Sequence, residues 1–133
     1  MTSERADFPE APDADYVRVL NSIDQLADLQ PGWNSYHADQ INEYARERAK
    51  RLVRSFLTHY PPVPTPRVAP TPNGGVLLHW DAGELEVEIT FDPIGGTYSV
   101  AQVDSPEFLV YGDNLGEGID EYKKIIEPYL FRR

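Results

Sequence analysis

The stretch "VLLHWDAGELEVEITF" at residues 76–91 decides the fold, because apolar and polar side chains alternate on both sides of a turn. Alternation with a period of two is typical of antiparallel strands that bury one face. If Ala82-Gly83 forms a two-residue turn, every alternating apolar residue falls on the same face of the hairpin. Those residues are Val76, Leu78, Trp80, Leu85, Val87 and Ile89. A three-residue turn would set Trp80 opposite Glu84, so we expect the two-residue turn.

The opposite face of this hairpin carries a row of carboxylates. Glu84, Glu86 and Glu88 occupy every second position, which places successive carboxylates roughly 6.7 Å apart along one strand face. One interpretation is a hydrated outer face that only keeps the protein soluble. The other is an acidic strip that docks on a basic protein surface. The same register sets His79 opposite Glu86, which fits either a solvent-facing cross-strand contact or the acid–base or metal-ligand pair of a hydrolase.

Further strands and a helix are predicted after this hairpin. The turn motifs "DPIGG" and "DSPE" predict strands over residues 97–103 and 108–112, which completes a four-stranded antiparallel meander. Residues 113–133 predict a C-terminal helix, in which Pro128 should bend or end the chain's helical course. One face of this helix is apolar and consists of Leu115, Ile119, Tyr122, Ile126 and Tyr129.

Two helices are predicted before the hairpin. Residues 1–12 read as a flexible acidic leader, and a first helix runs from Asp13 to the "QPG" sequence at 30–32. A second, longer helix is predicted from about Asp39 to His59. Its apolar stripe consists of Ile41, Tyr44, Ala45, Ala49, Leu52, Val53, Phe56 and Leu57.

A proline-rich connector, "YPPVPTPRVAPTPNGG" at 60–75, follows the second helix. Proline lacks an N–H and has a fixed φ, so this segment is predicted to be an extended spacer that is neither helix nor central strand. The complete order predicts an α+β fold in a single domain over residues 13–133. We expect two N-terminal helices, the connector, the four-stranded antiparallel meander, and a C-terminal helix packed on one sheet face.

Composition narrows the location of the protein. The chain has no cysteine, which excludes disulfides and thiolate metal sites. Its N-terminal sequence lacks the basic and apolar regions of a signal peptide. No apolar run is long enough to span a bilayer. A cytoplasmic protein that does not bind a membrane is therefore expected.

The net charge of −10 is unevenly distributed along the chain. Residues 68–122 contain eleven acidic residues and no Lys or Arg, whereas residues 41–67 contain six basic and two acidic residues. The predicted sheet therefore has no cations with which to neutralise phosphates, so direct nucleic-acid binding is not expected there. A basic surface of another protein would instead be attracted to it.

The loop "LQPGWNSYHADQ" at residues 29–40 carries aromatic side chains between the two predicted helices. A Trp directly after Pro-Gly most often packs into such a junction with its indole N–H bonded locally. We therefore expect Trp33 to be buried against Leu29 or the second helix, and Tyr36 to be partly buried. The alternative is that Trp33 and Tyr36 form an exposed hot spot for a partner.

Two motifs together resemble a group of small uncharacterised bacterial proteins. Members of this group are similar in a "GW-x-x-Y" loop before a helix, a proline-rich connector, and a "PTP-x-GG" sequence that leads into a hairpin. The matching positions are Gly32, Trp33, Tyr36, Pro70, Thr71, Pro72, Gly74, Gly75, Trp80 and residues 84–89. The resemblance covers about residues 26–92. It implies one recurring small fold and carries no activity.

The motifs of common enzyme classes are missing from the sequence. It contains no Gly-x-Ser-x-Gly elbow, no Gly-rich phosphate loop and no pair of His residues at ligand spacing. "DNLGEGIDEYKK" at 113–124 is only superficially similar to a calcium loop, because Leu115 and Lys124 stand where ligands are needed.

We therefore expect a non-catalytic, small acidic protein-binding module of the accessory, antitoxin, immunity or inhibitor type. It would dock on a basic surface of another protein, with no cofactor and no metal. The residues expected at this interface are Glu84, Glu86, Glu88, His79, Trp33 and Tyr36. Two alternatives remain, namely an inhibitor that mimics nucleic acid and a metal-dependent hydrolase that uses His79 and Glu86. The sequence leaves the oligomeric state open.

Overall fold

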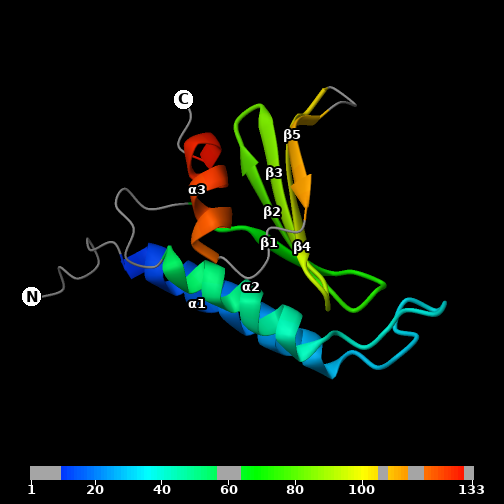
Figure 1. Ribbon diagram of the computed structural model, residues 1–133. Coiled ribbons are helices and arrows are strands. Elements are labelled where there is room, and N and C mark those ends of the chain that lie inside the picture. Colours follow the sequence, from blue (N-terminus) through cyan, green and yellow to red (C-terminus); the bar gives the residue numbers. More distant parts are fainter. Residues whose placement is uncertain (1–9, 57–63, 105–107, 114–118, 131–133) are drawn as a thin grey trace, which may run out of the picture.

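A five-stranded antiparallel sheet with helices on one of its faces forms the protein (Figure 1). The computed structural model describes residues 10–56, 64–104, 108–113 and 119–130. The helices are α1 (Glu10–Gln25), the short 3-10 helix η2 (Leu26–Asp28), α2 (Glu43–Ser55) and α3 (Ile119–Leu130). The strands are β1 (Arg67–Pro70), β2 (Val76–Ala82), β3 (Leu85–Phe91), β4 (Gly96–Gln102) and β5 (Phe108–Asp113). The fold is thus α+β, as predicted.

The sheet has one strand more than the predicted meander. The strand order is β1-β2-β3-β4-β5, so each strand pairs with its neighbours in the sequence. The additional strand, β1, comes from the proline-rich segment that was predicted to be only a spacer. It lies at the edge of the sheet and ends at Pro70. A strand with proline fits there because one side of an edge strand needs no N–H donors.

The buried face of the sheet is the one that the alternating sequence predicts. All six predicted residues of the β2–β3 hairpin are buried, and Phe91 joins them. Trp80 lies edge-on to Phe56 of the helical layer, with ring centroids 6.4 Å apart, and its indole N–H donates to the Pro64 carbonyl at 2.8 Å. Burial of this apolar face against the helices is the main source of stability that the fold offers.

The register of the hairpin differs from the prediction by two residues. Trp80 pairs with Val87, and the turn consists of Gly83 and Glu84 instead of Ala82 and Gly83. Gly83 has a φ of +68°. A two-residue turn with glycine first and an ordinary residue second is the type II′ pattern, which explains why the turn forms one position later. Because side chains alternate with a period of two, a shift of two leaves every residue on its predicted face.

The two N-terminal helices are present with different ends. α1 begins at Glu10, three residues before the predicted start and within the predicted leader. α2 begins at Glu43 rather than near Asp39, because the side chain of Asn42 caps it by accepting the N–H of Ala45 at 2.9 Å. Its last described helical residue is Ser55, and His59 lies outside the described residues.

The buried stripe of α2 contains an arginine that the sequence did not indicate. Arg48 is 1% exposed, whereas Tyr44, a predicted stripe residue, is 41% exposed. The Arg48 guanidinium donates to the carbonyls of Asp92 and Gly95 in the β3–β4 turn. It also lies 4.5 Å from the ring centre of Tyr44 and 5.2 Å from that of Phe91. Arg48 therefore fastens the helical layer to one end of the sheet.

The C-terminal helix packs on the buried face, as predicted. In α3 the side chains of Ile126 and Leu130 are buried and Tyr129 is partly buried against the same core. Leu115 lies outside the described residues, as do the side chains of Ile119 and Tyr122. No helix within the described part of the chain is long and apolar enough to cross a membrane.

Candidate functional site

The face of the sheet that points away from the helices is the candidate site. It is called the outer face below, and on the three central strands it consists of Leu77, His79, Asp81, Glu86, Glu88, Thr90, Thr97, Ser99 and Ala101. Each of these side chains is partly or fully exposed. No helix in the described ranges covers this face, and the helices lie together on the other side (Figure 1).

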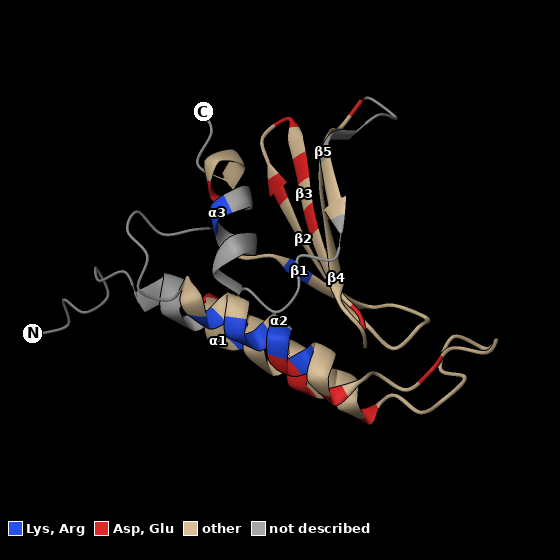
Figure 2. Ribbon diagram, in the orientation of Figure 1, with Lys and Arg blue, Asp and Glu red and all other residues tan. Residues whose placement is uncertain are grey.

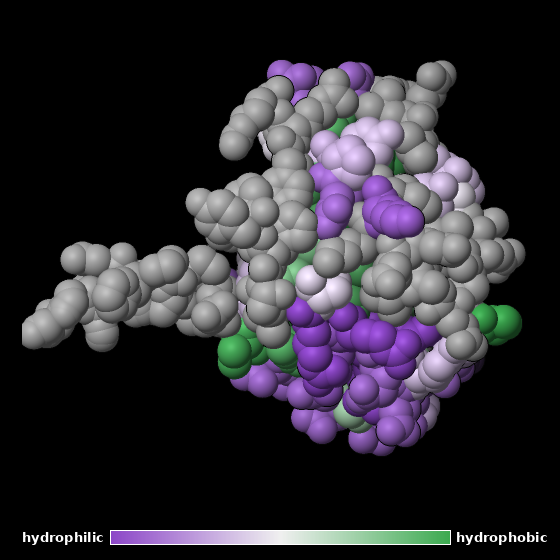
Figure 3. Space-filling view, turned by 60° about the vertical axis from the view of Figure 1, so that its left-hand side comes forward, coloured by the Kyte–Doolittle hydropathy of each residue, from purple (hydrophilic) through white to green (hydrophobic). Residues whose placement is uncertain are grey.

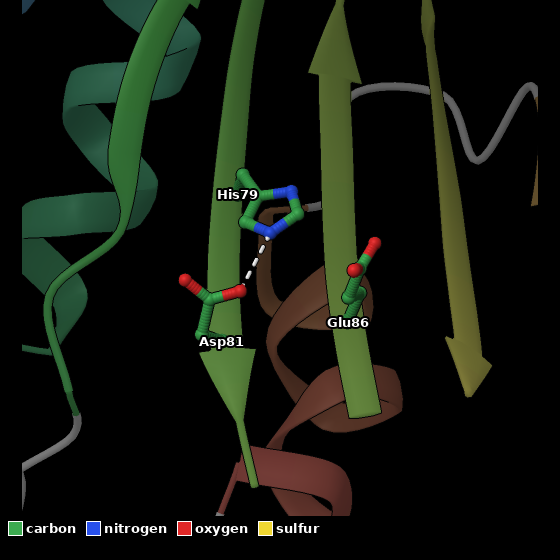
Figure 4. Close-up of side chains that lie close together, drawn as sticks. All are labelled: His79, Asp81 and Glu86. Atoms are coloured by element: carbon green, nitrogen blue, oxygen red, sulfur yellow. Dashed lines mark hydrogen bonds and ion pairs between the residues drawn. The ribbon is translucent and has the colours of Figure 1, made fainter. Parts of the chain in front are cut away.

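A network of charged side chains lies near the centre of the outer face. The ring of His79 is flanked by Glu88, whose Oε2 is 2.8 Å from Nδ1, and by Asp81, whose Oδ1 is 3.0 Å from Nε2. The other carboxylate oxygen of Asp81 is 3.4 Å from the Arg67 guanidinium on β1. Glu86 lies opposite Asp81 on β3, and its carboxylate lies across from the imidazole (Figure 4).

The two carboxylates determine the protonation of His79. A neutral imidazole has a single N–H, and an ionised carboxylate can only accept, so both contacts are satisfied only when the ring is doubly protonated. Burial opposes the charged ring, but the hydrogen bonds with Glu88 and Asp81 outweigh burial and raise the pKa of His79. The hydrogen bond from His79 lowers the pKa of Asp81, and the charge of Arg67 lowers it further.

The predicted carboxylate row is shorter than expected. Glu86 and Glu88 share the outer face of β3, but Glu84 belongs to the turn and not to a strand. The shift in register also gives His79 the cross-strand partner Glu88 instead of the predicted Glu86. Asp81 joins the cluster from β2, which the sequence did not indicate.

Arg67 is the second site residue that the sequence did not indicate. It lies opposite His79 because β1 pairs with β2. The signal for Asp81 was its position two residues after His79 on β2, which puts both side chains on the same face in any register. The signal for β1 itself was weaker, because only "RVA" separates prolines in that segment.

The aromatic loop lies at the other end of the sheet from the β2–β3 turn (Figure 1). Trp33 is partly buried against the core, and its indole N–H donates to the Asp39 carbonyl at 2.9 Å. Tyr36 is 78% exposed, so its predicted partial burial is wrong. The side chain of Asn34 accepts the N–H of Tyr36, and Ser35 has a φ of +69°; this tight local turn directs Tyr36 into solvent.

The outer face and the aromatic loop are therefore separate surfaces. No family model, curated protein or solved structure matches this chain. The resemblance to the small bacterial group rests on its motifs alone and stays a prediction. The segment that follows the GW-x-x-Y loop contacts the PTP-x-GG sequence, since the N–H of Asp39 donates to the Pro72 carbonyl and that of Asn42 to the Gly74 carbonyl, each at 2.8 Å.

An open depression of about 360 Å³ lies beside the candidate site, at the end of the sheet that carries the β2–β3 turn. It is lined by Gly83, Glu84, Gln102, Val103 and Asp104. His79 and Glu86 are not among these residues. Asp81 and Glu86 lie on the strands at this end of the sheet, and Glu84 and Asp104 lie in the turns. These four residues are called the acidic end below.

The sheet and its turns are mostly acidic, whereas the helical layer carries charges of both signs with most Lys and Arg on α2 (Figure 2). Figure 2 shows Lys and Arg along α2, while Asp and Glu lie on β2, β3 and the turns above them. Part of the positive charge is paired within the helical layer, where Lys50 lies 2.7 Å from Asp24. The region of α1 and α2 in the lower part of Figure 3 is almost entirely hydrophilic. The sheet therefore presents a surface whose sign differs from that of α2.

Proposed function

We propose that the protein is a non-catalytic binding module that docks on a basic surface of another protein through its outer face and acidic end. The observation that carries this proposal is the charge arrangement on an uncovered sheet face. Asp81, Glu84 and Glu86 project there from β2, the turn and β3, and the cations of α2 lie in the opposite layer. Such a surface steers basic partners toward itself and repels acidic ones.

The unpaired carboxylates lie at the acidic end. Within the described residues, the structure gives Glu84 and Glu86 no ion pair, while Asp81 and Glu88 are engaged by Arg67 and His79. The unengaged residues keep their charge available for a partner, and accessory, antitoxin, immunity and inhibitor roles all fit such a module.

The same geometry favours protein docking over the two alternatives. In this structure each ring nitrogen of His79 contacts a carboxylate, so neither nitrogen is free to act as the general base of a hydrolase. A nucleic-acid mimic would present uninterrupted negative charge, whereas Arg67 and His79 place positive charge within the row.

Charge reversal tests the proposal. Changing Glu84, Glu86 and Asp104 to Lys reverses the acidic end without removing the carboxylates that hold His79. A matched control changes Asp28, Asp39 and Glu43 to Lys, three exposed acids outside the sheet. Both variants alter the net charge by the same amount. Partners captured by the wild-type chain from its native host are identified by mass spectrometry, and their affinity is then measured by titration calorimetry in EDTA.

We expect the sheet variant to bind a captured basic partner at least tenfold more weakly than the wild type, because reversed charges repel it. The control variant should retain wild-type affinity. Equal binding by both variants would contradict the proposal. If DNA or RNA competes with the protein for the same partner, the result would support the nucleic-acid-mimicking inhibitor in place of the proposed function.

A further inference from the structure

Three side chains on neighbouring strands place one imidazole nitrogen and two carboxylate oxygens close together. The atoms are one each from His79, Asp81 and Glu86, and they all lie within 4.8 Å of one another (Figure 4). We propose that these three residues form a binding site for a divalent transition-metal ion of the Zn²⁺ type. The preferred interpretation of the sequence expected no metal, and the hydrolase alternative expected a metal at His79 and Glu86. The proposal does not require the docking function, although Asp81 and Glu86 belong to both surfaces.

The spacing of the ligand atoms suits such an ion. Zn²⁺ binds nitrogen and oxygen ligands at about 2.1 Å, so two ligand atoms at a tetrahedral angle lie about 3.4 Å apart. His79 Nε2 and Asp81 Oδ1 are already 3.0 Å apart. Glu86 must approach by at most about 1.4 Å to bring its ligand atom from within 4.8 Å to about 3.4 Å, and rotation of its long side chain can supply this movement.

Two neighbouring residues, Glu88 and Arg67, also support the site, because each contacts a proposed ligand on the side away from the ion. The Glu88 carboxylate lies 2.8 Å from His79 Nδ1. This is the arrangement of a metal-binding histidine, whose second nitrogen donates to a carboxylate and whose ligating nitrogen points at the ion. Arg67 lies against Asp81 Oδ2, so that Oδ1 remains directed at Nε2.

The chemistry of the three ligands selects the class of ion. One nitrogen with two carboxylates suits Zn²⁺ and related transition metals, whereas Ca²⁺ and Mg²⁺ prefer sites made entirely of oxygen. The ion would take the place of the proton between Nε2 and Oδ1, and that proton would be released to solvent. Asp81 is 65% exposed, so water can occupy the remaining coordination position.

Titration calorimetry with Zn²⁺ tests the site on the full, untagged chain after removal of metals with EDTA. The test variant is His79→Gln, and the matched control is His37→Gln, which changes an exposed histidine in the aromatic loop. The wild type and the control should bind one Zn²⁺ per chain with the same affinity. His79→Gln should bind at least tenfold more weakly, and Glu88→Gln should lose about 10–100-fold, as expected for the residue behind a metal-binding histidine.

A second variant and a second measurement distinguish loss of the metal ligands from misfolding of a variant. The double variant Asp81→Asn, Glu86→Gln keeps His79 but removes both carboxylate charges, and it should also lose the site. Imidazole ¹⁵N chemical shifts of the wild type should show Zn²⁺ on Nε2 of His79 and a proton on Nδ1. Wild-type affinity in His79→Gln, or equal losses in His79→Gln and His37→Gln, would overturn the proposal.

Discussion

Arg48 shows how a single buried charge can organise the packing of a small fold. Arg48 is the one charged residue that is buried among the residues that the structure describes. Its side chain extends from α2 to the β3–β4 turn. Its guanidinium donates to the carbonyls of Asp92 and Gly95, and the Gly95 carbonyl also accepts the N–H of Asp92. Its aromatic neighbours, Tyr44 and Phe91, reduce the cost of removing the charge from water.

Replacing Arg48 with Met should destabilise the protein by about 2–3 kcal/mol, because the carbonyls of Asp92 and Gly95 lose the guanidinium donors while the buried volume is nearly retained. The Gly95 carbonyl keeps the N–H of Asp92 as a donor. Urea unfolding followed by circular dichroism measures the free energy of unfolding. Arg51→Met, at an exposed position of the same helix, should stay within about 0.5 kcal/mol of the wild type. Equal stability of the two variants would show that Arg48 does not hold the turn.

His79 should make stability depend on pH near neutrality. Its pKa is raised in the folded state by the hydrogen bonds with Glu88 and Asp81, which outweigh the effect of burial. A raised pKa means that the stabilising contribution is complete below the unfolded value of about 6.5 and is lost as pH rises through the folded value. The lowered pKa of Asp81 acts at more acidic pH and does not enter this window.

The measurement is the free energy of unfolding between about pH 5.5 and 8.5 in EDTA, for the wild type and for His79→Gln. The difference in stability between them should decrease as pH rises. A difference that stays constant, or that grows with pH, would contradict the ion-pair description of His79. Proton NMR of the His79 ring gives the folded pKa directly.

At the scale of elements, two hairpins depend on glycine for different reasons. At Gly75 an added Cβ would lie 2.5 Å from the carbonyl oxygen of Phe91 and 2.7 Å from Thr71 Oγ1, so the turn into β2 leaves no space for a side chain. At Gly83 an added Cβ meets nothing within 4 Å, but the φ of +68° is unfavourable for other residues.

Gly75→Ala should therefore cost about 2–3 kcal/mol through steric overlap, and Gly83→Ala about 1 kcal/mol through backbone strain alone. Gly83→Asn should be milder than Gly83→Ala, because Asn tolerates positive φ. Thermal and urea unfolding of the three variants provide the comparison. If Gly83→Ala were the more harmful change, the assignment of the two roles would be reversed.

The sequence predicted which elements form and which faces they bury, because periodicity depends on local alternation. It did not predict the register, since two registers that differ by two residues bury the same side chains. It also missed β1, which forms although Pro70 ends it and prolines surround it. β1 forms because it pairs with β2, and the sequence of residues 67–70 alone does not show that this partner is available.

For the whole molecule, the uneven charge along the sequence becomes a separation in space. The acidic segment folds into the sheet and its turns, and much of the basic segment becomes α2 (Figure 2). The counts of acidic and basic residues in each segment of the sequence predicted this separation. Within the cluster of His79, Asp81 and Glu86, the sequence indicated the pair of His79 and Glu86 but not Asp81.

The strand order has a consequence for how the chain reaches its native state. Each strand pairs with the one that precedes it, and the two-residue turn between β2 and β3 is very short. Hairpins can therefore form one after another with little loop-closure entropy. Arg48, by contrast, bonds Asp92 across 44 residues. The kinetic barrier to folding should accordingly lie in the docking of the helical layer onto a sheet whose local pairings form early.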